Sequence, residues 1–377
     1  MHTRSTSTPL RKIILLTLAL TLTPGMLLQA QSDAEAREDS LKMAEALHLQ
    51  SQITFQVTAT GETRPVKTNL DDDAADDPAI WVHPRRPGKS LILGTNKKAG
   101  LYVYDMKGRI KQFMPTGRIN NVDVRNGFRH QGREMALVAA SNRTLNAISL
   151  YLIDPRTGIM TDTVANIPSG VDEVYGLCTY HNRQTNRFYA IVNGKNGVVE
   201  QWEITSNDND ITWSLTKQFA ANSQPEGMAA DDRTGLLYLG VEDEGIYVVN
   251  LNDPQPQLTL LPQSTSETPA IRYDIEGLAL FNHAAHTYLV ASIQGNFSYA
   301  VFNVTGQPRY VGSFVVKPGC IDGIEETDGL DITTRSCGGK YKQGMFVAQD
   351  GFNTNGTKAE SQNFKMVPVS KILPLLK

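Results

Sequence analysis

The sequence has few of the residues that build zinc sites or disulfide scaffolds. Its 377 residues include three cysteines and seven histidines, and these form no cluster with zinc-ligand spacing. The formal net charge is −3, so the chain also lacks the basic excess that nucleic-acid binding requires. We therefore expect neither a zinc protein nor a nucleic-acid-binding protein.

The cysteines that are present fall into two environments. Cys178 lies in the apolar run "VYGLCTY" and is predicted to be a buried thiol. Cys320 and Cys337 flank an acidic segment, and the sequence leaves open whether they are bridged. Three histidines in turn-like segments are expected to face solvent: His83, His181 and His283.

Long hydrophobic runs are missing except at the N-terminus. There, three basic residues precede the run "IILLTLALTL", and "LQAQ" offers a small-residue cleavage site after Ala30. The run is short for a membrane span. We predict a signal peptide over residues 1–30 and a helical or mobile leader over 31–51. The processed chain is expected in the periplasm or outside the cell, away from the membrane.

The body of the chain lacks a sustained helical period. It contains short β-branched and aromatic runs separated by polar turns. A Gly-centred pattern recurs every 50 to 52 residues, in "VYGLCTY", "PEGMAAD", "IEGLALF" and "TDGLDIT". A period near fifty with about four strands per unit is typical of propeller blades. The predicted fold is all-β, a six-bladed β-propeller over 52–377 with mostly four antiparallel strands per blade.

The repeated pattern places an acid beside the glycine in three of these segments. In a propeller the first strand of each blade lines the central channel, and glycine allows backbones to approach closely there. A single acid at such a position is more often a turn cap. Several in register favour one shared site at the mouth of the channel.

Charges of both signs are predicted to gather at that mouth. Clustered carboxylates repel one another and need cations, and oxygen-only ligand sets suit Ca²⁺. Basic residues occupy equivalent strand-to-strand turns in three successive units: Lys97 and Lys98, Arg143, and Lys195. A mouth with calcium on one side and cations on the other suits a polyanion rich in phosphate.

These motifs resemble one known family. "DDPAIWVHP", "TNKKAGLYVYDMKG", "NNVDVR", "AASNR", "DEVYGL", "EGMAADD", "DIEGL", "TDG" and "FVAQDG" resemble, in order, motifs of the β-propeller phytases over residues 57–370. The resemblance implies an exported, calcium-dependent phosphatase that acts on phytate (myo-inositol hexakisphosphate) or on its calcium complex. Several Ca²⁺ ions are implied, structural and catalytic, in a monomeric enzyme.

The resemblance also implies the site residues. The metal ligands would be Glu62, Asp76, Asp77, the carbonyl of Val122, Glu226, Glu242, Asp274, Glu276, Gln294, Asp322, Asp328 and Asp350. The phosphate-binding groups would be Lys97, Lys98, Arg143, Tyr175 and Lys195. We expect catalysis by direct attack of a metal-activated water, served by Lys97, Arg143, Tyr175, Glu226 and Asp274.

Two other functions remain open from the residues. One is a non-catalytic, calcium-stabilised propeller that binds a polyanionic ligand. The other is a calcium-dependent lactonase or esterase, against which the four basic side chains at the rim argue. Phosphate released from phytate, with and without calcium, separates the three.

Overall fold

The structure is a computed structural model that describes residues 37, 40–70, 72–207 and 210–377. The predicted signal peptide lies outside the described residues. The chain divides into two compact units, Met1–Ala44 and Glu45–Lys377, and the second contains all the described strands. Residues 40–51 are helical. Within the described ranges, no helix has the length and apolar character that a membrane crossing needs.

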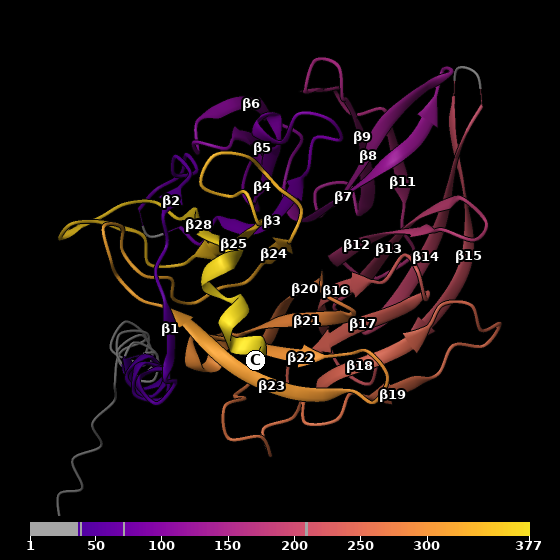
Figure 1. Ribbon diagram of the computed structural model, residues 1–377. Helices are drawn as coiled ribbons and strands as arrows, with labels where there is room; N and C mark the ends of the chain where they lie inside the picture. Colours follow the sequence, from indigo (N-terminus) through magenta and orange to yellow (C-terminus); the bar gives the residue numbers. More distant parts are fainter. Residues whose placement is uncertain (1–36, 38–39, 71, 208–209) are drawn as a thin grey trace, which may run out of the picture. The chain divides into compact units, whose positions relative to one another are not determined.

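Each of the first three sheets is built from strands that are consecutive along the chain (Figure 1). Blade 1 contains β3 (Ala75–Trp81), β4 (Leu91–Asn96), β5 (Gly100–Asp105) and β6 (Ile110–Met114). Blade 2 contains β7 (Ile119–His130), β8 (Arg133–Asn142), β9 (Ala147–Asp154), β10 (Ile159–Met160) and β11 (Ala165–Pro168). Blade 3 contains β12 (Val174–Asn182), β13 (Arg187–Gly194), β14 (Val198–Ser206) and β15 (Ile211–Ala220).

The last three blades repeat the same antiparallel order. Blade 4 contains β16 (Pro225–Ala230), β17 (Leu236–Val241), β18 (Gly245–Asn250) and β19 (Leu258–Leu260). Blade 5 contains β20 (Ile275–His283), β21 (His286–Ile293), β22 (Ser298–Asn303) and β23 (Arg309–Val316). Blade 6 contains β24 (Leu330–Thr333), β25 (Met345–Asp350) and β28 (Asn363–Pro368).

The sheets form a closed ring, which confirms the predicted six-bladed propeller. Each innermost strand contacts the innermost strand of the next blade, in the order β3, β7, β12, β16, β20, β24 and back to β3. The start of the body completes the last two sheets. β2 (Gly61–Glu62) is the outer strand of blade 6, and β1 (Phe55–Val57) adds in parallel to β23 of blade 5. The ring is therefore closed by a segment from the beginning of the propeller.

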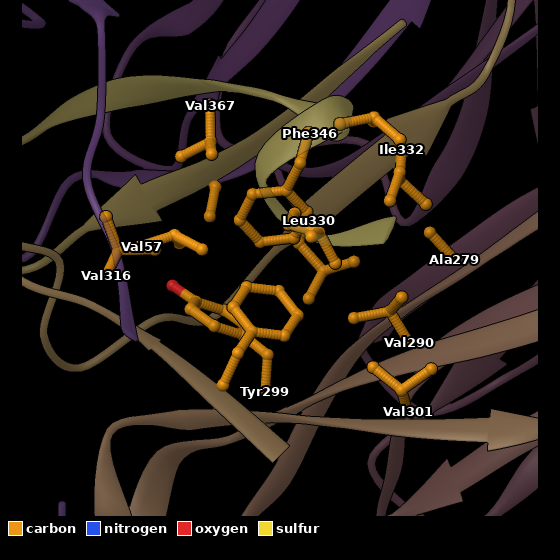
Figure 2. Packing of buried hydrophobic residues seen from close by; sticks show 14 of the residues in the cluster. Val57, Ala279, Val290, Tyr299, Val301, Val316, Leu330, Ile332, Phe346 and Val367 are labelled. Atoms are coloured by element: carbon orange, nitrogen blue, oxygen red, sulfur yellow. The ribbon is translucent and has the colours of Figure 1, made fainter. Parts of the chain in front are cut away.

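The hydrophobic core lies between blades. The described residues form six clusters of buried side chains, one at each junction of neighbouring sheets. Figure 2 shows the junction of blades 5 and 6, where Val290, Tyr299 and Val301 face Leu330 and Phe346. Burying an aliphatic or aromatic side chain of this size stabilises by about 1.5–3 kcal/mol. This packing fixes the angle of each blade and so the position of its inner strand.

Five of the six inner strands carry a β-bulge at the same place. The register shifts fall between Ala75 and Pro78, Ile119 and Val122, Val174 and Leu177, Pro225 and Met228, and Ile275 and Leu278. A bulge re-aims the side chains of the extra residues. The residues inside these bulges include Asp76, Asn120, Tyr175, Glu226 and Glu276, so one backbone device orients five polar side chains.

The repeated glycine has a steric cause. A Cβ on Gly176 would lie 1.8 Å from the carbonyl oxygen of Glu226, and a Cβ on Gly227 would lie 2.0 Å from that of Glu276. The amide of Gly277 donates to the carbonyl of Asp328 at 2.6 Å. Each glycine thus abuts the backbone of the acid in the next blade. The acid-glycine pattern recurs because the ring packs the acid of one blade against the glycine of the previous one.

The cysteines and histidines are partly as expected. Cys178 is a buried thiol, as predicted, and Cys320 and Cys337 are also free, so they form no bridge in this structure. The expectation that His83 and His181 face solvent is wrong, because both are buried. His181 stacks on Phe188 with ring centroids 3.9 Å apart. His181 lies within β12 rather than in a turn, and His83 follows β3, where Arg86 donates to its ring.

Candidate active site

Three glutamates form the centre of the mouth. Carboxylate oxygens of Glu226, Glu242 and Glu276 all lie within 4.8 Å of one another. Glu226 and Glu276 come from bulges in β16 and β20, and Glu242 follows β17. Burial raises the pKa of Glu276 well above its usual value, and the charge of Glu226 raises it further. Carboxylates placed this closely stay ionised only if a cation compensates them.

Two amide side chains hold this cluster. Asn120 donates to Glu226 Oε1 at 2.9 Å, and Gln224 donates to Glu242 Oε1 at 2.6 Å. Burial nevertheless raises the pKa of Glu242 to about 7; the bond from Gln224 opposes this, and the charges of Glu226 and Asp274 reinforce it. Asp274 therefore lies close enough for its charge to raise the pKa of Glu242.

A second acidic group surrounds Lys97. Its ammonium lies 2.7 Å from Asp73, 3.2 Å from Asp76 and 2.9 Å from Asp328. Burial works to lower the pKa of Lys97, but the three carboxylates outweigh it and the pKa is raised. Gln294 donates to the other oxygen of Asp328 at 2.7 Å. Lys97 is therefore a permanent cation within the acidic side of the mouth.

Asp77 and Val122 lie where the mouth enters the channel. The amide of Val122 donates to Asp77 Oδ2 at 2.9 Å, and burial raises the pKa of Asp77 well above its usual value. Both residues line a cavity of about 520 Å³ that continues to Arg183 and Arg233 at the far end of the inner strands. Asp77 thus belongs to the channel rather than to the glutamate cluster.

Other acids beside the channel clasp neighbouring strands. Asp331 accepts the amide of Ile80 at 2.7 Å, which joins blade 6 to blade 1. Asp123 of blade 2 accepts the amide of Thr179 in blade 3 at 2.8 Å. These carboxylates accept hydrogen bonds from backbone amides. The acidic residues of the inner strands therefore form two sets: one at the mouth that can bind a cation, and one below it that joins neighbouring strands.

The cationic side of the mouth is built around Tyr175. Arg143 and Lys195 both lie over its ring, at 5.8 Å and 5.0 Å from the centroid. Glu173 pairs with Arg143 and lies 3.8 Å from Lys195. Burial raises the pKa of the Tyr175 hydroxyl, and the charges of Glu226, Glu276, Asp76 and Glu242 raise it further. The hydroxyl is therefore protonated and faces the acids.

Asn120 links the two sides. It accepts a hydrogen bond from Arg143 at 3.3 Å while donating to Glu226. Lys98, by contrast, is exposed, and its backbone amide donates to the side-chain oxygen of Asn96 at 2.9 Å. Its charge helps to lower the pKa of Asp72, after the hydrogen bonds from Thr68 and Asn69. Lys98 lies at the rim and outside the paired network.

Three of the predicted metal ligands form a separate cluster in blade 6. The buried ammonium of Lys365 contacts Glu62 at 2.8 Å, Asp350 at 3.3 Å, and Asp322. Asn353 also accepts from it, at 2.7 Å. Three carboxylates face one ammonium, so a net negative charge remains. Asp350 Oδ2 is buried without a hydrogen bond.

Several residues of the mouth escaped prediction as site residues. Asn120, Glu173 and Gln224 carry no repeated acid-glycine signature, and each acts by holding a predicted residue. Asn120 lies inside the blade 2 bulge, and Glu173 directly precedes the blade 3 bulge. Aligning the blades position by position would have found Asn120, because it occupies the same bulge position as Glu226.

The side chains present fit calcium. The donors are carboxylate and amide oxygens, which Ca²⁺ prefers. Among the described residues, Asp76 Oδ1 and Glu276 Oε2 are buried oxygens without a hydrogen-bond partner. A buried, unsatisfied carboxylate oxygen is costly unless a cation meets it. Both point to a cation in the mouth beyond Lys97.

Fold and mouth together define a class of protein. It is a six-bladed propeller that sets clustered carboxylates against two cations and a tyrosine. Residues 18–376 match the phytase family, and the chain belongs to that family. It is 42% identical over 327 residues to the 3-phytase of Bacillus subtilis (strain 168), covering 84% of this chain and 85% of that protein.

One solved structure is a more distant likeness. The crystal structure of BBS1N in complex with ARL6DN, soaked with lead, is 11% identical, with a TM-score of 0.46 over 77% of this chain and 78% of that chain. The fold assignment rests on the strand order and ring closure described above. Family membership makes the chain a phytase-type enzyme, which decides against the non-catalytic alternative.

Proposed function

We propose that the mouth hydrolyses phosphate monoesters of phytate in a calcium-dependent reaction, by direct attack of water on phosphorus. The observation that carries the proposal is the juxtaposition of Glu226, Glu242 and Glu276 with Arg143 and Lys195 across one mouth. Phosphoryl transfer needs positioning and charge stabilisation more than covalent chemistry. A surface that offers carboxylates for metal and cations for phosphate supplies both.

Calcium held by Asp76, Glu226, Glu242, Asp274, Glu276, Gln294 and Asp328 would neutralise phosphoryl oxygens and lower the pKa of a water. The blade 6 acids Glu62, Asp322 and Asp350, and Asp77 with the carbonyl of Val122, are proposed as structural positions. The residual negative charge around Lys365 supports the three blade 6 acids.

The protein's own groups do the remaining work. Arg143 and Lys195 bind the phosphoryl oxygens. In the absence of substrate both side chains are positioned by Glu173, and the phosphoryl oxygens replace this carboxylate as their partner. Tyr175 donates a hydrogen bond from its protonated hydroxyl. Glu226 or Asp274 orients the attacking water and accepts its proton. Lys97 fixes Asp76 and Asp328, and Lys98 at the rim is placed to hold a neighbouring phosphate of the same substrate.

Loss of the cationic side should impair hydrolysis but not folding. We expect Arg143→Ala to lower kcat/KM for phytate roughly 10- to 100-fold, the value of a charge-assisted hydrogen bond. Tyr175→Phe should lower it up to about tenfold, because a neutral donor is lost. Phosphate release and the melting temperature measure the two effects separately.

The matched control is Arg129→Ala, an exposed arginine at the other end of β7. It should retain wild-type turnover. If Arg143→Ala and Tyr175→Phe also kept wild-type rates, the assignment of this mouth would be wrong.

We also propose that the chain is exported and cleaved after Ala30, on the charge and apolar pattern of residues 1–30. In an exporting bacterial host, mass spectrometry of the product should show a chain that begins at Gln31. Leu18→Arg, which interrupts the apolar run, should leave the precursor in the cytoplasm. Finding Met1 retained on exported wild-type protein would contradict the cleavage.

A further inference from the structure

A second cavity lies away from the mouth. It has a volume of about 640 Å³ and is formed by turns of blades 1, 2 and 6: the loop after β3, the β5–β6 and β9–β10 turns, and the loop between β24 and β25. Small-molecule sites occupy roughly 300–1,000 Å³. The cavity is therefore large enough for a small ligand, and no residue of the proposed active site lines it.

Strand direction places this cavity on the face opposite the mouth. β3 starts beside Asp76 and ends at Trp81, so the loop that follows it emerges at the far end of the blade. In an antiparallel blade the β5–β6 turn emerges at that same end. β24 likewise follows Asp328 and runs away from the mouth. The cavity and the active site are therefore at opposite ends of the strands.

The lining of the cavity is strongly basic. One carboxylate, from Asp105, faces seven basic side chains: Arg86, Lys89, Lys107, Arg109, Lys111, Arg156 and Lys340. The whole chain has more acidic than basic residues, 39 against 36. So uneven a lining in an acidic protein concentrates positive potential in one concave surface.

Most of these cations have no acidic partner. Arg109 pairs with Asp105 at 2.7 Å, and Arg156 pairs with Asp154 at 2.6 Å. In the described part of the chain, the ammonium groups of Lys89, Lys107 and Lys111 have neither an ion pair nor a hydrogen bond. Their mutual repulsion is relieved only by solvent or by a bound anion.

One arginine is already positioned by the backbone. Arg86 donates from Nη2 to the carbonyl of Arg156 at 2.8 Å, across the gap between blades 1 and 2. Lys340 in the blade 6 loop donates to the carbonyl of Thr60, and its ammonium lies 5.4 Å from the ring centroid of Tyr341. Two of the cations are thereby held at the cavity walls, and among the described residues no carboxylate pairs with either of them.

We infer that this cavity is a second anion site, which binds a small polyphosphorylated molecule without hydrolysing it. Several separated cations around one concavity match several phosphate groups better than a single phosphate. The lining offers none of the clustered carboxylates that the mouth offers for calcium, so a ligand held here is bound and not turned over. The inference goes beyond the proposed function and does not depend on it.

The test uses the calcium-loaded protein and myo-inositol hexasulfate, whose sulfate esters supply the charge pattern without a phosphate monoester to cleave. Calorimetry should find two equivalents bound to the wild type. Lys107→Glu with Lys111→Glu should weaken one equivalent at least tenfold, and salt should weaken the wild-type event steeply. Turnover of phytate at low concentration should stay within about twofold, because neither lysine belongs to the mouth.

The matched control is Arg129→Glu with Lys358→Glu, which changes charge equally at exposed positions outside the cavity. It should retain both equivalents. Arg143→Ala should weaken the other equivalent, so that failure of the active-site proposal is seen separately. Hexasulfate binding by the Lys107/Lys111 variant with the stoichiometry and affinities of the wild type would overturn the inference.

A membrane surface is the competing ligand. The fraction of protein that sediments with phosphatidylglycerol vesicles should be no larger for the wild type than for the Lys107/Lys111 variant. The proposal would be overturned if the Lys107/Lys111 variant lost binding to vesicles but kept its binding of hexasulfate. The ligand of the cavity would then be a lipid surface and not a small anion.

Discussion

Removal of calcium is expected to abolish phosphate release from phytate and to lower the melting temperature in the same titration. Without the ion, the carboxylates of Glu226, Glu242 and Glu276 face one another within 4.8 Å with no metal charge between them. Loss of preorganised charge stabilisation typically costs about 10²–10³ in rate. An ion present at 100 times its dissociation constant stabilises the folded state by about 2.7 kcal/mol, so both readouts should move together.

The measurement is phosphate release and thermal unfolding across a chelator series, followed by return of calcium. Glu276→Gln gives the matched comparison, because it removes one charge from the cluster at nearly constant volume. Its melting temperature should respond less to chelator than that of the wild type. Full turnover in excess chelator would refute the metal role, and an unchanged melting temperature would confine calcium to the reaction alone.

Replacement of the buried lysine in blade 6 is expected to have the largest effect on folding. Lys365 is 0% exposed and its ammonium is shared among Glu62, Asp322 and Asp350. Burial works to lower its pKa, but these carboxylates outweigh burial and raise it, so the side chain stays charged. Lys365→Met leaves three acids without their ammonium. Breaking a buried ion pair on one side costs about 3–5 kcal/mol.

Urea unfolding in chelator measures this cost without compensation by a bound ion. Lys358→Met, at an exposed position in β27 (Lys358–Ala359), is the control and should change the free energy of unfolding by less than about 0.5 kcal/mol. Adding Asp350→Asn to Lys365→Met should recover part of the loss, because one unpaired buried charge is removed. Equal stability of Lys365→Met and the wild type would show that the ammonium is not what compensates these acids.

The repeat was the strongest signal in the sequence, and the structure explains why. In four of the six blades a glycine abuts the backbone of the next blade, as Gly227 does at Glu276, so the same residue type recurs at the spacing of one blade. The period of the sequence pattern follows from that contact. The acids beside those glycines were also predictable, and a bulge at the same place orients Glu226 and Glu276.

The residues that position the site residues could not be predicted from the sequence, because they do not recur at the spacing of the blades. Glu173 matters through Arg143 and Lys195, and Gln224 matters through Glu242. Lys365 lies in the unremarkable strand β28, and its partners come from positions 62, 322 and 350. Contacts across 300 residues depend on how the ring closes, which local pattern does not encode.

By itself, then, the amino-acid order determined the propeller, its six units and the acid-and-base character of one mouth, because strand period and blade repeat are local properties. Only the tertiary structure decided which charges neutralise which. It paired Lys97 with three aspartates, left Lys98 at the rim, and gathered Lys107, Lys111 and Arg86 on the opposite face. Coulomb interactions depend on distance in space, and that distance is set when the ring closes.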